Sequence, residues 1–196
     1  NQYLSFTSQA ARKLDADVTT ICWSGKGVYL NYKEAYRVDP TGALVQDADA
    51  KKTVPDLWRA RTYAADITQT DYPFDKEKAE DKPQVVFISL GTNDFSRDEQ
   101  PVNADPTKLP GNNLPDGDML IPEEYKKFKD LYLQFGNDVR AKRPDAHIFI
   151  ATPPMLTDQF PLENARQLVK DALAFIVSER QKQGDNKVYA MNLVEM

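Results

Sequence analysis

Apolar positions along the chain switch between two periods, and this switching predicts helices and strands that follow one another in turn. Apolar positions spaced three and four apart predict helices at 3–14, 55–65, 122–142 and 161–183. Short runs rich in apolar and β-branched residues predict strands at 17–24, 84–90, 146–151 and 187–194. This alternation predicts a parallel sheet with helices on both faces.

The segment 84–90, with the sequence QVVFISL, gives the clearest strand signal. A continuous apolar run of this kind is typical of a central parallel strand that is covered on both faces. Together with the alternating elements, it predicts an α/β fold, a three-layer α/β/α sandwich with a mostly parallel central sheet. Between the elements, 28–52 is mixed with a turn at 39–42, and 75–82 is a charged surface run. The Pro-, Asn- and Asp-rich stretch 95–121 has the length of loops that often cover active sites.

Bulk composition excludes several classes of function. The net charge of −5 and the absence of a basic stripe argue against nucleic acid as a partner. No apolar run approaches the ~20 residues that cross a bilayer, so no membrane partner is expected. One histidine and one cysteine cannot make the usual zinc sets, so no metal site is expected. No cofactor is expected either, because Gly25-x-Gly27 lacks the third glycine of a dinucleotide fingerprint.

Two predicted strands end in residues suited to chemistry. Ser24-Gly25-Lys26-Gly27 follows the strand at 17–24, and Gly91-Thr92-Asn93-Asp94 follows the strand at 84–90. Ligands of open α/β sheets bind beyond the carboxyl ends of the strands. A glycine lets its backbone N–H approach a substrate oxygen closely, and an asparagine amide offers further N–H donors. Such donors aimed at one point form an oxyanion hole.

The wording of these segments resembles a known family. Residues 90–94, LGTND, resemble the G-x-N-D block of SGNH/GDSL hydrolases, and 22–27, CWSGKG, resemble the glycine block of that superfamily. With ATPPM at 151–155, the wording is most similar to carbohydrate esterase family 2, whose members are acetyl xylan esterase-like. The resemblance implies an SGNH-type, flavodoxin-like fold. The implied function is the removal of acetyl groups from a carbohydrate through a serine nucleophile.

The resemblance also implies roles for particular residues. Gly25 and Asn93 match the two oxyanion positions. Trp23, Gly27 and Thr92 are expected to line the substrate site, although Trp23 suits a core position equally well. Asp94 is expected to be structural, holding its turn or capping the next segment. The expected partner is an acetylated polysaccharide or oligosaccharide, and secretion to the extracellular space follows as an expectation.

Two further blocks of the superfamily are missing from the sequence. The chain contains no Gly-Asp-Ser, and its single histidine, His147, begins a predicted strand outside any D-x-x-H pattern. We therefore expect residues 1–196 to be one partial SGNH domain that lacks its first strand and its C-terminal helix. Alone, it is expected to be inactive. The oligomeric state is not predicted.

Two alternatives stay open at this point. The first is a non-catalytic polysaccharide-binding module that uses the same strand ends to hold a sugar chain. The second is an SGNH esterase or lipase that acts on another acyl ester.

Overall fold

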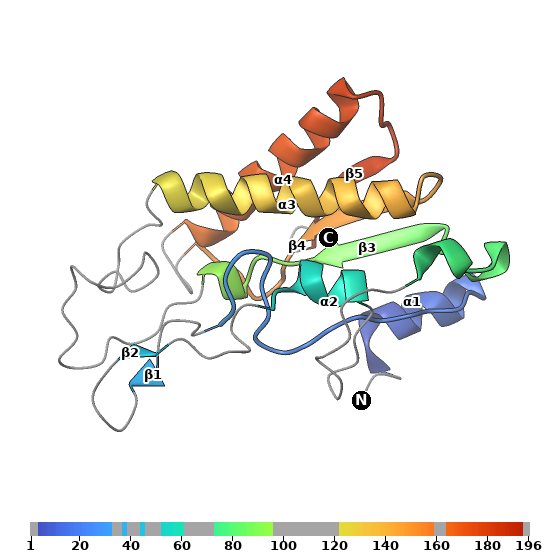
Figure 1. Cartoon of the computed structure of the whole chain (residues 1–196), viewed down its shortest axis with the longest axis horizontal. Coiled ribbons are helices and arrows are strands. Elements are labelled where there is room, and N and C mark those ends of the chain that lie inside the picture. The colour runs from blue at the N-terminus through green and yellow to red at the C-terminus, as the bar shows by residue number, and fades with distance from the viewer. Residues whose placement is uncertain are drawn as a thin grey trace.

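The computed structural model describes residues 4–32, 37–38, 44–45, 52–60, 73–95, 122–158 and 164–193. A three-stranded parallel sheet forms its centre, in the order β3 (Val85–Ser89), β4 (His147–Thr152) and β5 (Val188–Asn192). A short antiparallel pair, β1 (Arg37–Val38) and β2 (Leu44–Val45), lies apart from it (Figure 1). The predicted parallel sheet is thus present.

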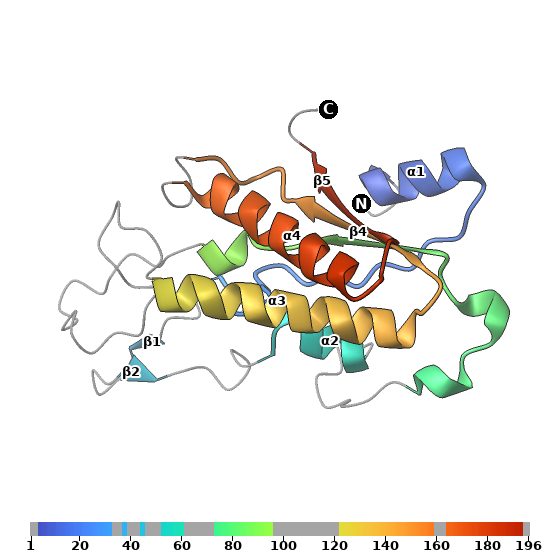
Figure 2. The ribbon, with the colours of Figure 1, turned by 90° about the horizontal axis from the view of Figure 1, so that it is seen from above.

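Helices cover both faces of this sheet (Figure 2). α1 (Phe6–Leu14) lies on one face, and α2 (Val54–Ala60), α3 (Pro122–Lys142) and α4 (Ala165–Lys182) lie on the other. Short 3₁₀ turns connect them: η3 (Phe74–Lys76), η4 (Ala79–Asp81) and η5 (Asn93–Phe95). The predicted α/β/α class is confirmed. The assignment of 1–196 to a single domain stays a prediction.

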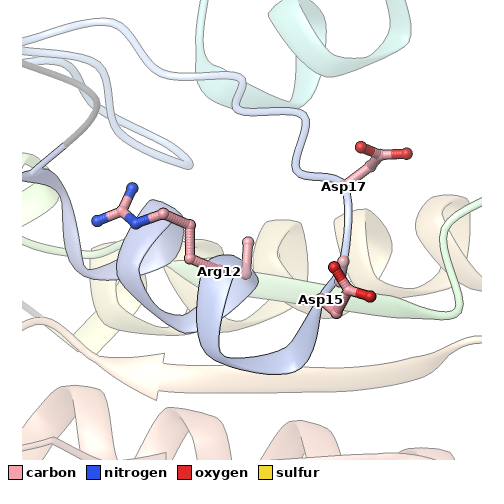
Figure 3. A pocket seen from close by; sticks show the side chains of 5 residues that line it. Arg12, Asp15 and Asp17 are labelled. Atoms are coloured by element: carbon pink, nitrogen blue, oxygen red, sulfur yellow. The ribbon is translucent and has the colours of Figure 1, made fainter.

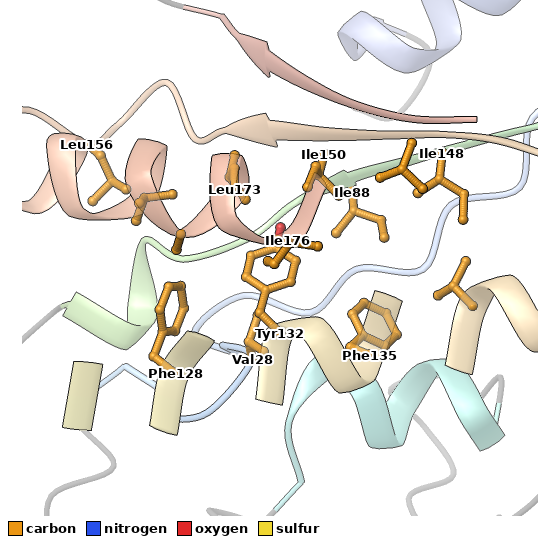
Figure 4. Packing of buried hydrophobic residues seen from close by; sticks show 14 of the residues in the cluster. Val28, Ile88, Phe128, Tyr132, Phe135, Ile148, Ile150, Leu156, Leu173 and Ile176 are labelled. Carbon is orange, nitrogen blue, oxygen red and sulfur yellow. The ribbon is translucent and has the colours of Figure 1, made fainter. Parts of the chain in front are cut away.

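The core lies between the sheet and the helices α3 and α4, which cover one of its faces. Phe128, Tyr132 and Phe135 of α3 point toward the strands, as helical spacing requires (Figure 4). They meet Ile148 and Ile150, each 1% exposed, from β4. Each such fully buried apolar side chain stabilises the fold by roughly 1.5–3 kcal/mol.

The opposite face of the sheet carries a row of aromatic side chains. Phe87, Phe149 and Tyr189 are paired in register across the three strands. The rings of Phe149 and Tyr189 stack at 4.8 Å, and Phe6 of α1 meets Phe87 edge-on at 5.4 Å. Phe6 still exposes 59% of its surface, so α1 covers this face only lightly.

Two strand predictions were wrong in detail. Residues 16–23 form no ladder with the described strands, although β-branched residues predicted a strand at 17–24. The segment 84–90 was predicted to be central, but β3 lies at the edge of the described sheet and Val85 is 56% exposed. Both differences have one cause, because a strand is defined by its hydrogen-bonded neighbours and the apolar pattern does not name them.

The boundaries of the helices differ by a few residues from the predicted ones. α3 spans the predicted range, α4 covers 165–182 of the predicted 161–183, and α1 covers 6–14 of 3–14. α2 occupies 54–60, and the rest of that prediction lies outside the described residues. The turn at 39–42 and most of the loop at 95–121 also lie outside them.

An ion-pair cluster lies at the amino-terminal ends of the strands. Asp185, just before β5, accepts hydrogen bonds from Arg140 of α3 and Arg180 of α4 at 2.8–3.1 Å. Burial opposes ionisation of Asp185, but the bonds from Arg140 and Arg180 outweigh it and hold the pKa of this carboxyl below its ordinary value. The cluster ties both helices to the start of the last described strand.

A second ion pair is fully enclosed. Arg143, next to the end of α3, lies 2.6 Å from Glu77, and each side chain is 3% exposed. The Arg143 guanidinium also lies 5.0 Å from the centre of the Phe74 ring. This pair holds the η3–η4 segment against α3. Removing one partner leaves the other charge buried and unpaired.

Glu77→Gln is expected to lower the free energy of unfolding by about 3–5 kcal/mol, because Arg143 would lose its buried partner. Glu80→Gln is the matched control, since Glu80 lies close by, is 75% exposed and is 3.8 Å from Lys78. The control is expected to change stability by less than about 0.5 kcal/mol. Urea unfolding followed by circular dichroism measures both, and equal losses would contradict the account of the pair.

Candidate active site

Residues 24–32, here called the glycine loop, fold back on themselves directly after residues 16–23, which form neither helix nor strand. Gly25 has φ +81°, a left-handed conformation that favours glycine. Its carbonyl accepts a hydrogen bond from the N–H of Tyr32 at 2.6 Å. The N–H of Gly27 donates to the Asn31 side chain at 3.1 Å, and Val28 anchors the loop in the core with 2% exposure.

Two consecutive residues after β3, Asn93 and Asp94, are hydrogen-bonded to this loop through their side chains. The Asn93 amide nitrogen donates to the carbonyl of Lys26 at 2.8 Å. The Asp94 carboxylate accepts from the N–H groups of three consecutive loop residues at 2.6–3.1 Å, namely Val28, Tyr29 and Leu30. Asn93 therefore satisfies an acceptor of the loop, and Asp94 satisfies its donors.

The Asp94 carboxylate is deeply buried, with 1% of the residue exposed. Burial raises the pKa of Asp94 to about 6, although the N–H groups of Leu30, Tyr29 and Val28 act in the opposite direction. The phenol of Tyr132, on α3, lies close enough to this carboxylate to be affected by its charge. Its own burial, and then the Asp94 charge, raise the pKa of the Tyr132 phenol, so that this group stays neutral at ordinary pH.

Gly27 lies at the tightest point of the loop. A Cβ atom there would lie 1.9 Å from the Leu30 carbonyl oxygen and 2.7 Å from an Asp94 carboxylate oxygen. The carbonyl of Gly27 accepts from Val54 at the start of α2 at 2.8 Å. These contacts indicate that Gly27 closes the loop. Its role in lining a substrate site stays a prediction, and the engaged N–H does not favour it.

The structure brings the other predicted residues to the same place. Gly25 directly precedes Lys26, whose carbonyl binds Asn93, so the two predicted oxyanion residues lie on neighbouring segments. Trp23 is half-buried, and the Lys26 ammonium lies 5.3 Å from the centre of its ring. Thr92 is half-buried between β3 and Asn93. The roles of these residues in binding or catalysis stay predictions.

His147 does not share this site. It is the first residue of β4, while the site lies beyond the last residue of the parallel strand β3. A strand of 6 residues spans about 16 Å, so the two are separated by the length of the sheet. The His147 ring is hydrogen-bonded to the Tyr189 hydroxyl at 2.9 Å. The sole histidine of the chain is therefore not the base for this loop.

An open depression at the end of α1 offers no competing site. Ala11, Arg12, Asp15, Ala16 and Asp17 line it. In Figure 3, Arg12 points away from Asp15 and Asp17, so these charged groups do not converge on one ligand. Across the part of the chain that the structure describes, no three His, Cys, Asp or Glu side chains are grouped to hold a metal ion. The described helices include none that is long and apolar enough to cross a membrane.

Comparison with known proteins gives the site its context. No family model matches the chain. The cellulase/esterase CelE of Acetivibrio thermocellus is 30% identical over 189 residues, which are 96% of this chain and 17% of CelE. A family two carbohydrate esterase from Clostridium thermocellum, solved in complex with cellohexaose, matches 98% of this chain and 44% of its own, with 29% identity and a TM-score of 0.64.

A third protein agrees with these two. The carbohydrate esterase family 2 enzyme of Corynascus thermopiles (Myceliophthora fergusii), solved with a carbohydrate binding domain, matches 93% of this chain and 44% of its own at 26% identity and a TM-score of 0.63. The chain is related to the family 2 carbohydrate esterases. The resemblance seen in the sequence is thereby confirmed. The chain spans less than a fifth of CelE and under half of the solved esterases.

Within this family-like site, sequence reasoning missed the partners of Asp94. Asp94 was expected to hold its own turn or to cap the next segment, but its carboxylate binds a loop 64–66 residues earlier in the chain. It also missed Asn31, which is 5% exposed and donates to the Lys52 carbonyl as well as accepting from Gly27. No local pattern marks such distant partners, and only the adjacency of Asp94 to Asn93 could have drawn attention to it.

Gly27→Ala is expected to lower the free energy of unfolding by at least ~1–3 kcal/mol, because the added methyl group overlaps the Leu30 carbonyl and the Asp94 carboxylate. Gly136→Ala in α3 is the control, since its Cβ would lie 3.8 Å from Ile176, an ordinary contact. Alanine is the better helix former, so the control is expected to gain up to ~1 kcal/mol. Urea unfolding compares the two, and a neutral Gly27→Ala would refute the tight loop.

Proposed function

We propose that this chain carries the oxyanion hole of a carbohydrate esterase that removes acetyl groups from a polysaccharide. The observation that supports this most directly is the bond from the Asn93 amide to the Lys26 carbonyl, next to Gly25. This bond orients the Asn93 amide and places it beside the glycine loop. The family relationship and the matching LGTND and CWSGKG segments support the same proposal.

In the proposed reaction, a serine oxygen attacks the acetyl carbonyl carbon and the carbonyl oxygen becomes an oxyanion. An amide nitrogen carries two hydrogens, and the bond to Lys26 uses one of those of Asn93. The second is proposed to donate to the oxyanion together with the N–H of Gly25. The bond to the sugar oxygen then breaks as that oxygen takes the serine proton through a base. Water hydrolyses the acetyl-enzyme to acetate.

The described residues supply the anion-stabilising half of this chemistry. Ester hydrolysis also needs a nucleophile and a base, and the chain contains neither Gly-Asp-Ser nor a second histidine. Oxyanion donors alone give only a small residual rate. The activity is therefore proposed for the full-length gene product, and a secreted location is proposed with it because acetylated polysaccharides are extracellular.

The proposed substrate is an acetylated polysaccharide or oligosaccharide. The related Clostridium thermocellum esterase was solved with cellohexaose, which supports a sugar chain as the ligand of this site. Trp23 is proposed to line the sugar or acyl pocket, because it adjoins the glycine loop and aromatic faces suit sugar rings. The same complex favours one rival, a non-catalytic module that binds polysaccharide at this place.

Asn93→Ala in the full-length protein is expected to reduce acetate release from acetylated xylan by ~10²–10³-fold, because one oxyanion donor is lost. Asn186→Ala is the control, since Asn186 is exposed and lies before β5 at the opposite end of the sheet. Its expected rate is within about twofold of the wild type.

Two results would overturn the proposal. An Asn93→Ala protein with an undiminished rate would remove Asn93 from the oxyanion hole. A folded full-length protein that binds cellohexaose in calorimetry but releases no acetate would replace the esterase by the binding module. Activity on long-chain acyl esters without activity on acetylated xylan would instead indicate another SGNH esterase.

A further inference from the structure

We propose that Asp94 is a positioning residue of this oxyanion hole, fixing the glycine loop so that Gly25 and Asn93 face one common point. This inference rests on the proposed function and adds a residue to it. Asp94 does not touch the reacting atoms in this account. It acts through the three loop N–H groups that its carboxylate holds.

The argument starts from the shared position of Asn93 and Asp94 in η5. Asn93 holds the loop at Lys26, one residue before Gly27, and Asp94 holds it at Val28–Leu30, directly after Gly27. One short turn therefore fixes the loop on both sides of Gly27. A shift of the Asp94 carboxylate would move the loop relative to Asn93.

Close packing leaves little freedom for such a shift. A Cβ on Gly27 would lie 2.7 Å from an Asp94 oxygen, so the carboxylate lies directly against the loop backbone. The side chain of Val28 is buried in the same hydrophobic cluster as Ile88 and Tyr132, and this anchors the loop in the core (Figure 4). Oxyanion donors work only when they are held 2.7–3.1 Å from the developing charge. A rigid loop meets this requirement.

The Asp94 carboxylate has its hydrogen-bond partners in the glycine loop. Its recorded hydrogen bonds come from Val28, Tyr29 and Leu30, and the Tyr132 phenol is the titratable group that faces it from α3. Among the described residues, no Lys or Arg is hydrogen-bonded to it. Bonds from neutral N–H groups to a charged acceptor are about twice as strong as neutral ones. The loop N–H groups thus offset part of the cost of burying this charge, although burial still raises the pKa of Asp94.

Kinetics of the full-length protein test the positioning role. Asp94→Ala is expected to lower kcat on acetylated xylan by ~100-fold, comparable to the loss of one donor, while KM changes less than about threefold. Asp94→Asn keeps one oxygen as an acceptor but loses the charge, so a loss of ~10-fold is expected. Asp185→Asn is the control, because Asp185 is likewise a carboxylate with little solvent exposure and several hydrogen-bond donors, here Arg140 and Arg180, but it lies at the opposite end of the strands. It is expected to lose stability and keep kcat.

A second measurement also uses the full-length protein but needs no activity. In nuclear magnetic resonance titrations, the amide signals of Val28, Tyr29 and Leu30 are expected to shift together with a midpoint near pH 6, the pKa to which burial raises Asp94. This step should vanish in Asp94→Asn. Because the folded-state pKa lies above the ordinary 3.8, the folded chain retains a proton that the unfolded chain has lost. The unfolding free energy is therefore expected to fall as pH rises between these values.

The outcomes separate this inference from the proposed function. Asp94→Ala with wild-type kcat, or loop amides without a common titration, would overturn the positioning role while Asn93→Ala still reported on the esterase. Equal losses of kcat in Asp94→Ala and Asp185→Asn would mean that Asp94 contributes only to the stability of the fold. This result would also overturn the positioning role. An inert full-length protein whose loop amides titrate as expected would overturn the esterase proposal and would leave Asp94 as a residue that fixes the loop of a site without esterase activity.

Discussion

The buried Asp94 carboxylate, held by three consecutive N–H groups of the glycine loop, is the interaction on which the site depends. It joins two segments more than sixty residues apart at a place that is almost fully shielded from solvent. Each side needs the other, because the carboxylate would otherwise be a buried charge and the N–H groups would otherwise be unsatisfied donors. The neighbouring bond from Asn93 to Lys26 has the opposite polarity. Together they hold the loop where an oxyanion is proposed to bind.

The fold supplies the frame for this contact. β3 ends at Ser89, one residue short of the Gly91–Asp94 turn, and its pairing with β4 fixes the direction in which that turn leaves the sheet. α3 packs against this turn, since Phe128 and Tyr132 are fully buried and Phe95 packs edge-on against Phe128 at 5.2 Å. The apolar core thus makes the low-dielectric surroundings in which a few fixed donors can stabilise charge strongly. The residues that stabilise the fold between α3 and the sheet therefore also support the proposed oxyanion hole.

Much of this could be predicted from the sequence, and the omissions have a common physical origin. Periodicity identified α3, α4 and the sheet strands, because burial on one face leaves a local pattern. It placed a strand at 17–24 and put 84–90 in the centre of the sheet, because pairing partners leave no such pattern. The asparagine segment was found from its position after the strand β3, and the glycine segment from its position after a predicted strand that the structure does not form. The loop-holding role of Asp94 and the tight packing of Gly27 depend on contacts between distant segments.

The most direct test is a crystal structure of the full-length protein with a methylphosphonate ester. Its tetrahedral phosphorus imitates the carbon of the acetyl intermediate, and its phosphoryl oxygen imitates the oxyanion. The account predicts that this oxygen lies 2.7–3.1 Å from both the Gly25 backbone nitrogen and the Asn93 amide nitrogen. The Lys26 and Asp94 contacts should remain as they are here. A phosphoryl oxygen bound elsewhere, or a glycine loop that moves away from Asn93 when the ester binds, would contradict it.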